Sequence, residues 1–348
     1  MIRLLLFSSC AWLAGCGTPV AARTTSAPAR SIGCSSGDET ACRAQARAAC
    51  DSDHCADSLL DRWCDDGDAN ACYTLGFEAD PAGPLLVQSP TAGPNENSFT
   101  PAAKDSVAAR RYDERACKLG SLAGCENLGA LLAQGRGGEI DWTRAEALFQ
   151  RACDGGNVRG CTALASVYFE GGPPEKRDES RSAAISAKAC EAGDAVACSN
   201  LGFQYVEGRG VARDVRSGMA LYEQACQGGN GPACMNIGSL YALGTDVPKD
   251  DVRATDYLIA ACNADNPAIF ACGAVGRRIA EGVGVTADAK CGVAILEHAC
   301  DGGYAIGCAQ LGYYYAQGKV VQIDKDRART YYARACKLGH SDSCVARN

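Results

Sequence analysis

Cysteines recur in this sequence at a spacing that could support disulfide bonds, metal binding or thiol redox chemistry. The 348 residues include 23 cysteines. One pair, Cys262/Cys272, is separated by ten positions and another, Cys50/Cys55, by five. Eight pairs are separated by eight positions: Cys34/Cys42, Cys64/Cys72, Cys117/Cys125, Cys153/Cys161, Cys190/Cys198, Cys226/Cys234, Cys300/Cys308 and Cys336/Cys344. The compartment and the neighbouring residues decide between the three chemistries.

The first residues have the pattern of a targeting segment. Arg3 precedes an apolar stretch, Leu4–Ala14, which is too short to span a bilayer as a helix. It ends in LAGC, which resembles the lipobox of bacterial lipoproteins. That resemblance implies a signal peptide at 1–15 and a diacylated Cys16 whose new N-terminus is also acylated. The alternative is an ordinary signal peptide cleaved near Ala22.

A small, polar segment follows the lipobox. Residues 17–33 are rich in Ala, Ser, Thr and Gly, and we expect residues 16–33 to form a flexible tether that reaches about 20–25 Å. Gly17 stands where an Asp would resemble an inner-membrane retention signal. The sequence therefore predicts an extracytoplasmic protein, lipid-anchored to the cell envelope at the outer membrane.

An oxidising compartment favours disulfide bonds over metal. Zinc sites typically use CxxC knuckles or Cys/His mixtures, and the sequence has no CxxC and only three histidines. We expect no metal and no cofactor. If Cys10 leaves with the signal peptide and Cys16 carries lipid, the ten pairs leave Cys291 unpaired. Its interpretation stays open between a reactive or intermolecular thiol, a buried free cysteine, and an alternative partner for Cys262 or Cys272; the pairing of Cys50 and Cys55 is open too.

The cysteine pairs follow a repeat. From Cys117 onward, the first cysteines of successive pairs are separated by 36, 37, 36, 36, 38 and 36 residues. A period in the thirties is typical of helical solenoids. We expect a solenoid over 34–348 with about seven or eight repeats, irregular at 34–79. A Pro/Gly/Ser-rich segment at about 80–103 is predicted to be a disordered insert.

Each repeat reads as two helices. The first, helix A, follows the second cysteine, as in SNLGFQYVEG, where Leu201 and Tyr205 are four residues apart and Gly202 permits close approach. A glycine-rich turn and then helix B follow. Helix B has a small residue eight positions before its cysteine and large apolar residues four or five positions before it. Each pair should therefore join the end of one helix B to the start of the next helix A.

The segment LGFQYVEGRGVARD…ALYEQACQGG resembles the Sel1-like repeat, with its LGxxYxxGxGVxxD core. The added C-x7-C resembles the cysteine-rich, secreted, Hcp-type branch of that family. The match covers about 110–348 and is weak over 34–79; YFEGGPPEKRDES lacks the GxGV turn. The resemblance implies an all-α, right-handed α/α superhelical solenoid of antiparallel helix pairs, TPR-like and here disulfide-stapled.

The Hcp-type resemblance also implies penicillin binding and slow β-lactam hydrolysis in some relatives. No GxSxG, SxxK, KTG, HExxH or P-loop motif occurs in the sequence, so no catalytic residue is assigned. A weak β-lactamase stays the alternative function. Binding of peptidoglycan-derived fragments or of a β-lactam ligand is a third hypothesis.

A column of amides could bind a peptide. Two positions after the second cysteine stand Asn127, Asn200, Asn236 and Gln310, and helix A lines the concave surface in such superhelices. Each amide offers a donor and an acceptor to an extended peptide; the alternative is local hydrogen bonding at the helix start. Arg277, Arg278, Tyr313 and Tyr314 occupy variable positions between the Leu and Tyr of the core and suit a partner-binding face, or are simply solvated.

These features predict a protein- or peptide-binding scaffold at the cell envelope, attached to the membrane through its lipid. The net charge is −7 and basic residues form no long run, so we expect no nucleic-acid partner.

Overall fold

The computed structural model describes residues 39–49, 53–80, 106–264 and 269–346. The predicted signal peptide, the lipidation site Cys16, the tether, Cys34, Cys50 and nearly all of the predicted insert lie outside the described residues. Over these ranges the chain forms helices and turns, with no β-strand. No described helix has both the length and the apolar character that crossing a membrane would require.

The described chain forms two compact units, with the boundary between Leu221 and Tyr222. The N-terminal unit contains α2 (Glu39–Ala48), α3 (Asp53–Asp65), α4 (Ala69–Ala79), α5 (Ser106–Lys118), α6 (Leu122–Gln134), α7 (Trp142–Asp154), α8 (Val158–Ser166), the short elements η1 (Val167–Gly171) and η2 (Pro174–Lys176), α9 (Glu179–Glu191) and α10 (Ala195–Glu207). The boundary falls inside α11 (Val215–Gln227).

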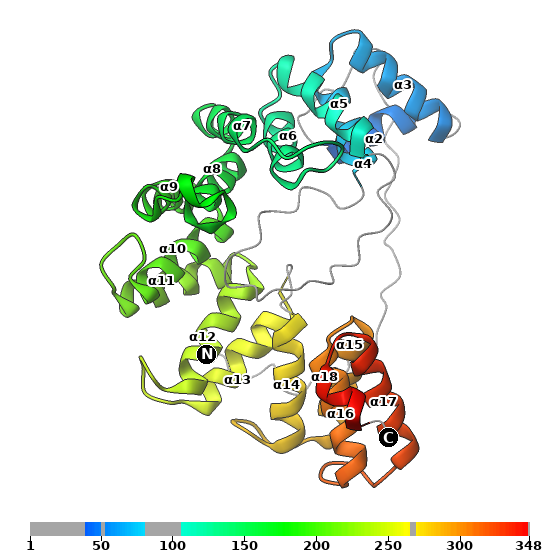
Figure 1. Cartoon of the computed structure of the whole chain (residues 1–348), viewed down its shortest axis with the longest axis vertical. Helices are drawn as coiled ribbons and strands as arrows, with labels where there is room; N and C mark the ends of the chain where they lie inside the picture. Colours follow the sequence, from blue (N-terminus) through cyan, green and yellow to red (C-terminus); the bar gives the residue numbers. More distant parts are fainter. Residues whose placement is uncertain (1–38, 50–52, 81–105, 265–268, 347–348) are drawn as a thin grey trace. The chain divides into compact units, whose positions relative to one another are not determined.

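The C-terminal unit contains α12 (Gly231–Leu243), α13 (Asp251–Cys262), α14 (Ile269–Glu281), α15 (Ala289–Asp301), α16 (Ala305–Gln317), α17 (Lys325–Lys337) and α18 (Ser341–Ala346). Within each unit, consecutive helices pack side by side as pairs (Figure 1). The predicted fold class, an all-α array of antiparallel helix pairs, is confirmed.

The repeat sequence explains where the helices begin and end. An aspartate precedes helix B in most repeats, and its carboxylate accepts a backbone N–H three residues later, as Asp178 does from Arg181 at 2.9 Å. Helix A ends at a glycine such as Gly208, whose φ of 71° favours glycine. A Cβ on the next glycine, Gly210, would lie 2.1 Å from the Glu179 carbonyl oxygen, so the turn packs directly on the preceding helix B.

Helix A and the following helix B interlock through a glycine and a large side chain. A Cβ at Gly129 of α6 would lie 2.7 Å from the Phe149 ring of α7, and one at Gly312 of α16 would lie 2.7 Å from the Tyr332 ring of α17. The large residue is the one four positions before the cysteine. The repeat at 158–194 departs from this rule, with Ala165 in the glycine position and Ser186 in the large position.

Disulfides join successive repeats as predicted. Eight of the predicted pairs are bonded in the structure: Cys64–Cys72, Cys117–Cys125, Cys153–Cys161, Cys190–Cys198, Cys226–Cys234, Cys262–Cys272, Cys300–Cys308 and Cys336–Cys344. Each bond connects the last turn of one helix B to the first turns of the next helix A. Eight disulfides indicate an extracytoplasmic, oxidising location.

Three further cysteines of the described chain, Cys42, Cys55 and Cys291, are also disulfide-bonded. Cys34–Cys42 and Cys50–Cys55 stay predictions. The prediction that Cys291 is unpaired is wrong. Cys291 lies in the first turn of α15 and is 8% exposed, and the regular spacing of the cysteine pairs assigned it no partner.

Hydrogen bonds between side chains connect helix B of one repeat to helix B of the next. Tyr257 donates to Glu223 at 3.1 Å, and Tyr331 donates to Glu297 at 2.8 Å. In both pairs the tyrosine stands five positions before its cysteine, and the glutamate stands three positions before the cysteine of the preceding repeat. This contact fixes neighbouring repeats together on the helix B side.

Candidate binding crevice and groove

The repeat without the GxGV turn ends its helix A in an unusual way. α8 continues after Ser166 as a π-helical turn, η1, which the Gly172 N–H closes by donating to the Val167 carbonyl at 3.1 Å. π-Helical turns inside α-helices are frequent at functional sites. η1 carries Phe169, which is 4% exposed and meets Phe203 of α10 edge-on, with ring centroids 5.9 Å apart.

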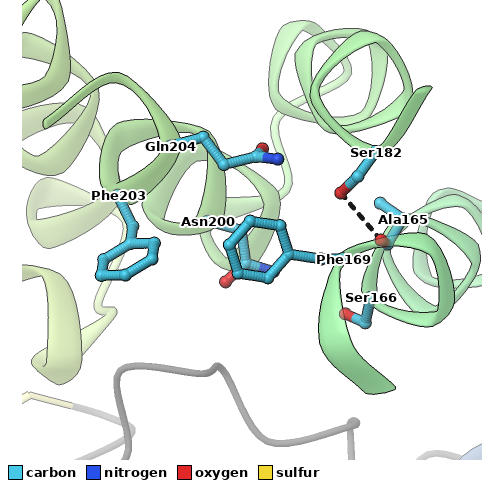
Figure 2. Close-up of a pocket in the computed structure, with 7 residues that line it drawn as sticks. All are labelled: Ala165, Ser166, Phe169, Ser182, Asn200, Phe203 and Gln204. Atoms are coloured by element: carbon cyan, nitrogen blue, oxygen red, sulfur yellow. Dashed lines mark hydrogen bonds between the residues drawn. The ribbon is translucent and has the colours of Figure 1, made fainter. Parts of the chain in front are cut away.

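A crevice lies in the N-terminal unit where α10 meets α8, η1 and α9 (Figure 2). Its volume is about 250 Å³ including space open to solvent, and within it there is room, about 10 Å³, for roughly one water-sized group. All its lining residues are uncharged: Ala165, Ser166, Phe169, Ser182, Asn200, Phe203 and Gln204.

Gln204 gives the crevice a fixed acceptor. Its side chain is 1% exposed, and Nε2 donates to the Glu179 carbonyl at 3.3 Å. Because that contact requires the nitrogen, the orientation of the carboxamide is set and Oε1 is left as an acceptor. Oε1 is buried and has no hydrogen-bond partner. A buried acceptor of this kind is rare in folded proteins.

Asn200 adds a second acceptor one helical turn earlier on α10. Its Oδ1 is also buried without a hydrogen-bond partner. The two hydroxyls of the crevice are already used, since Ser182 donates to the Ala165 carbonyl at 2.8 Å and Ser166 donates to the Thr162 carbonyl at 3.0 Å. Figure 2 shows Gln204 and Asn200 extending from one helix beside Phe169 and Phe203. Unused hydrogen-bonding capacity therefore concentrates on the two amides.

A cation lies next to the crevice. The Arg209 guanidinium stacks over the Phe169 ring, 4.1 Å from its centroid, and its Nε is 3.0 Å from Glu179 Oε1. Nearby, Tyr168 donates to Glu146 at 2.6 Å. Burial, followed by this hydrogen bond, raises the pKa of Tyr168 to about 12, so this phenol is neutral in the physiological range.

The other members of the predicted amide column have different surroundings. Asn127 is 4% exposed, and its side chain hydrogen-bonds to the buried Asp113 carboxyl of α5. Burial raises the pKa of Asp113 well above its usual value, the Asn127 hydrogen bond opposes that shift, and the Glu126 carboxyl adds to it. Asn127 thus contacts a buried acid. Asn236 is half-buried, with Nδ2 buried and without a hydrogen-bond partner.

Gln310 and Tyr313 meet in an open groove of the C-terminal unit. The groove lies among α16, α17 and α18, has a volume of about 680 Å³ including space open to solvent, and is also lined by Tyr332, His340 and Asp342. Tyr313 is 42% exposed. The structure therefore brings together two of the predicted binding residues here.

Two predicted surface residues are buried, which corrects the sequence interpretation. Arg278 is 6% exposed and donates to Thr255 Oγ1 at 2.7 Å and to Asp251 Oδ1 at 2.8 Å. Tyr314 is fully buried and donates to Glu281 at 3.0 Å. Both face the preceding helices and not solvent. Arg277 is exposed and forms an ion pair with Glu281 at 3.8 Å.

Several side chains of types that can act in catalysis have structural roles among the described residues. Their cysteines are all disulfide-bonded, and they contain no cluster of three metal-ligating side chains. His340 Nδ1 lies 2.9 Å from Ser343 Oγ, which resembles a nucleophile and base. However, Ser343 is 1% exposed, and the same nitrogen accepts the Ser343 backbone N–H at 3.3 Å. The pair caps α18.

Sequence reasoning missed most of the crevice. Asn200 was predicted, whereas Gln204, Phe169 and Phe203 were not. The available signal was the departure of YFEGGPPEKRDES from the repeat core, together with two amides, Asn200 and Gln204, four residues apart.

The alternation of helix pairs, the interlocking glycines and the disulfide between successive pairs define a helix-pair repeat protein of the solenoid class. The Sel1 repeat model matches residues 122–157, 158–194, 195–230, 231–266 and 305–340, which together exceed half of the chain. The chain belongs to the Sel1 repeat family. A comparison with curated proteins found no match.

Solved structures show the same fold. A Sel1 repeat protein from Oxalobacter formigenes is 22% identical with a TM-score of 0.63, and the match covers 89% of this chain and 86% of that one. A protective antigen of uropathogenic Escherichia coli with an SLR fold is 23% identical with a TM-score of 0.60, over 82% of this chain. The chain spans 57% of the length of that antigen. Sel1 repeats generally mediate protein–protein interaction.

Proposed function

We propose that this protein is an extracytoplasmic scaffold that binds a protein or peptide partner through helix A surfaces. The observation that carries the proposal is the pair of buried, unpaired amide oxygens of Gln204 and Asn200 beside Phe169 and Phe203. Groups of this kind provide the specific contacts of a binding site, while aromatic walls supply apolar area. The groove around Tyr313 and Gln310 offers a second, more open surface in the C-terminal unit, which is also lined by Asp342.

We further propose that the chain is lipid-anchored. The support is the LAGC sequence at Leu13–Cys16 after a short apolar stretch, which favours a signal peptide at 1–15, lipidation of Cys16, a tether at 16–33 and attachment to the outer membrane. Metabolic labelling with a clickable palmitate analogue tests this. Label should enter the wild-type chain and be absent from Cys16→Ser, and label retained by that variant would contradict the proposal.

Membership of the cysteine-rich, Hcp-type branch is also part of the proposal, because eight disulfides follow the repeat register. Because some members of that branch hydrolyse β-lactams slowly, β-lactam hydrolysis is the competing function. The described residues favour the scaffold, since their cysteines are bonded and the Ser343–His340 pair caps a helix. Purified protein should turn over nitrocefin no faster than a heat-inactivated sample. Turnover that survives further purification and disappears on heating would establish the hydrolase.

Site-specific photo-crosslinking in cells tests the scaffold directly. A photoreactive phenylalanine at Phe203 or at Tyr313 should give discrete adducts with a protein of the envelope. Matched controls at Ala184 of α9 and Val252 of α13, both exposed on helix B, should give none. The scaffold proposal fails if all four positions give the same adducts or if none does. Adducts with muropeptides alone would support a peptidoglycan-derived ligand instead of a protein.

A further inference from the structure

The crevice beside α10 provides no hydrogen-bond donor to its buried acceptor. Gln204 Oε1 is buried and unpaired, and its position is fixed because Nε2 donates to the Glu179 carbonyl. An acceptor that loses its hydration without gaining a partner destabilises the folded chain. A ligand that supplies the donor recovers this loss. That ligand belongs to the partner of the proposed function, on which this inference rests.

The donor must serve two acceptors. Asn200 and Gln204 are four residues apart on α10, so their Cβ atoms lie on one helix face about 6 Å apart. Both line the crevice, and the Asn200 oxygen is also buried and unpaired. A group with two N–H donors matches this arrangement, whereas a hydroxyl or a backbone amide supplies one.

Charge decides against a cationic ligand. All residues that line the crevice are uncharged, and the Arg209 guanidinium over Phe169 is already paired with the Glu179 carboxylate. An ammonium group would therefore lose its hydration without gaining a carboxylate of its own. A neutral donor avoids this cost.

The crevice is narrow and has flat walls. It has room for about one water-sized group, and Phe169 and Phe203 form apolar walls that meet edge to face. We propose that the crevice receives the terminal carboxamide of an asparagine or glutamine side chain of the partner protein. Its NH2 group donates to Gln204 Oε1 and Asn200 Oδ1, and its aliphatic stem lies along the phenylalanines in the open part of the crevice.

Propionamide is the probe that tests this, because it is the smallest molecule with the proposed carboxamide and stem. The purified, disulfide-bonded chain is titrated with propionamide while ¹H–¹⁵N spectra report the side-chain amides of Gln204 and Asn200. Parallel titrations use N,N-dimethylpropionamide, which has no donor, 1-propanol, which has one, and propylammonium, which is charged. Propionamide should give saturable shifts at both side chains, with an affinity about fivefold or more above that of any other compound.

Three results of the ligand series would contradict the proposal. Absence of saturation with propionamide would mean that the crevice holds water only. Tighter binding of propylammonium would make it a cation site. Equal binding of N,N-dimethylpropionamide would show that the aromatic walls, and not the amide oxygens, bind the ligand. Because the series uses the wild-type chain, none of these results depends on whether a variant folds.

Variants locate the contact. Gln204→Leu and Asn200→Leu should each lower the affinity for propionamide by about fivefold or more, because each replaces one acceptor by an apolar side chain of similar size. Asn200 has no hydrogen bond to the rest of the chain through Oδ1, so its variant tests the idea if Gln204→Leu fails to fold. Tyr314→Phe is the matched control, since Tyr314 holds the same repeat position in the C-terminal unit, and it should leave the affinity unchanged. Unchanged affinity in Asn200→Leu overturns the proposal.

This inference and the proposed function fail separately. If propionamide does not bind but Phe203 still crosslinks a protein in cells, the scaffold stands and its ligand chemistry is different. If propionamide binds as described but crosslinking shows no protein partner, the amide site stands and the scaffold does not.

Discussion

Tyr257 Oη donates to Glu223 Oε1 at 3.1 Å, across the joint between two consecutive helix B segments. Burial, followed by this hydrogen bond, raises the pKa of Tyr257 to about 12. The unfolded chain gives a tyrosine a pKa of about 10. The bond therefore contributes fully to stability below about pH 10, and the contribution is lost as the pH rises from about 10 through 12.

Removing this contact should make the C-terminal unit less stable. We expect Tyr257→Phe to lower the free energy of unfolding by about 0.5–1 kcal/mol at pH 8 and to reduce the loss of stability between about pH 10 and 12. Urea unfolding measures both effects. A double-mutant cycle with Glu223→Ala should show a coupling of similar size, and additive single effects would contradict a direct bond.

Asp113 should make the folded chain less stable as the pH rises above about 4. Its pKa is raised by burial, so its contribution is complete below about pH 4, the unfolded value, and is lost as the pH rises toward the folded pKa. The loss should be about 1.4 kcal/mol per pH unit over that interval. Asp113→Asn should remove this slope and unfold at a higher urea concentration than wild type at pH 7. Asp326→Asn, at a side chain that is 92% exposed, is the control, and an unchanged slope in Asp113→Asn would refute the assignment.

The interlock between α6 and α7 should tolerate no added atom. A Cβ at Gly129 would lie 2.7 Å from the Phe149 ring, so Gly129→Ala should lower the free energy of unfolding by about 1–3 kcal/mol. Phe149→Leu in the same chain should recover part of the loss, because it shortens the opposing side chain. Thermal unfolding of the two single variants and the double variant measures this. Strictly additive losses would show that the clash is not the cause.

The disulfides should act as independent reinforcements. Replacing Cys190 and Cys198 together by serine opens a loop of eight positions and should cost roughly 2.5 kcal/mol in the chain-entropy model. The Cys262/Cys272 double variant should cost a similar amount. Because the two bonds lie in different units, we expect the losses to add when both are removed. A loss well above the single-bond value on removing only one would mean that one joint organises several repeats.

The fold could be predicted from the sequence because the residue pattern that indicates it is local and recurs in successive repeats. The helix A and helix B stripes, the LG pair and the cysteine at the end of helix B recur every 36 to 38 residues, so each repeat confirms the reading of the others. Cys291 shows the limit of this logic. It is disulfide-bonded, although the regular spacing of the cysteine pairs gave it no partner.

The candidate site was harder to predict from the sequence than the fold, for a geometric reason. Arg277 with Arg278, and Tyr313 with Tyr314, were each assigned to the surface as pairs, but adjacent helical residues point about 100° apart. The first of each pair is exposed and the second is buried against the preceding helix. The crevice depends on three elements and on the π-helical turn that positions Phe169, and none of that follows from one repeat read alone.

The position of the disulfides has a consequence for survival among extracytoplasmic proteases. The turn between the two cysteines is where the chain is open to attack, as at Glu191, Ala192 and Gly193, which are all exposed. A protease that cuts there opens the backbone but leaves the fragments joined by the Cys190–Cys198 bond. The same holds at every closed joint. Nicks at these sites change the mass seen on a reducing gel and leave the array covalently whole.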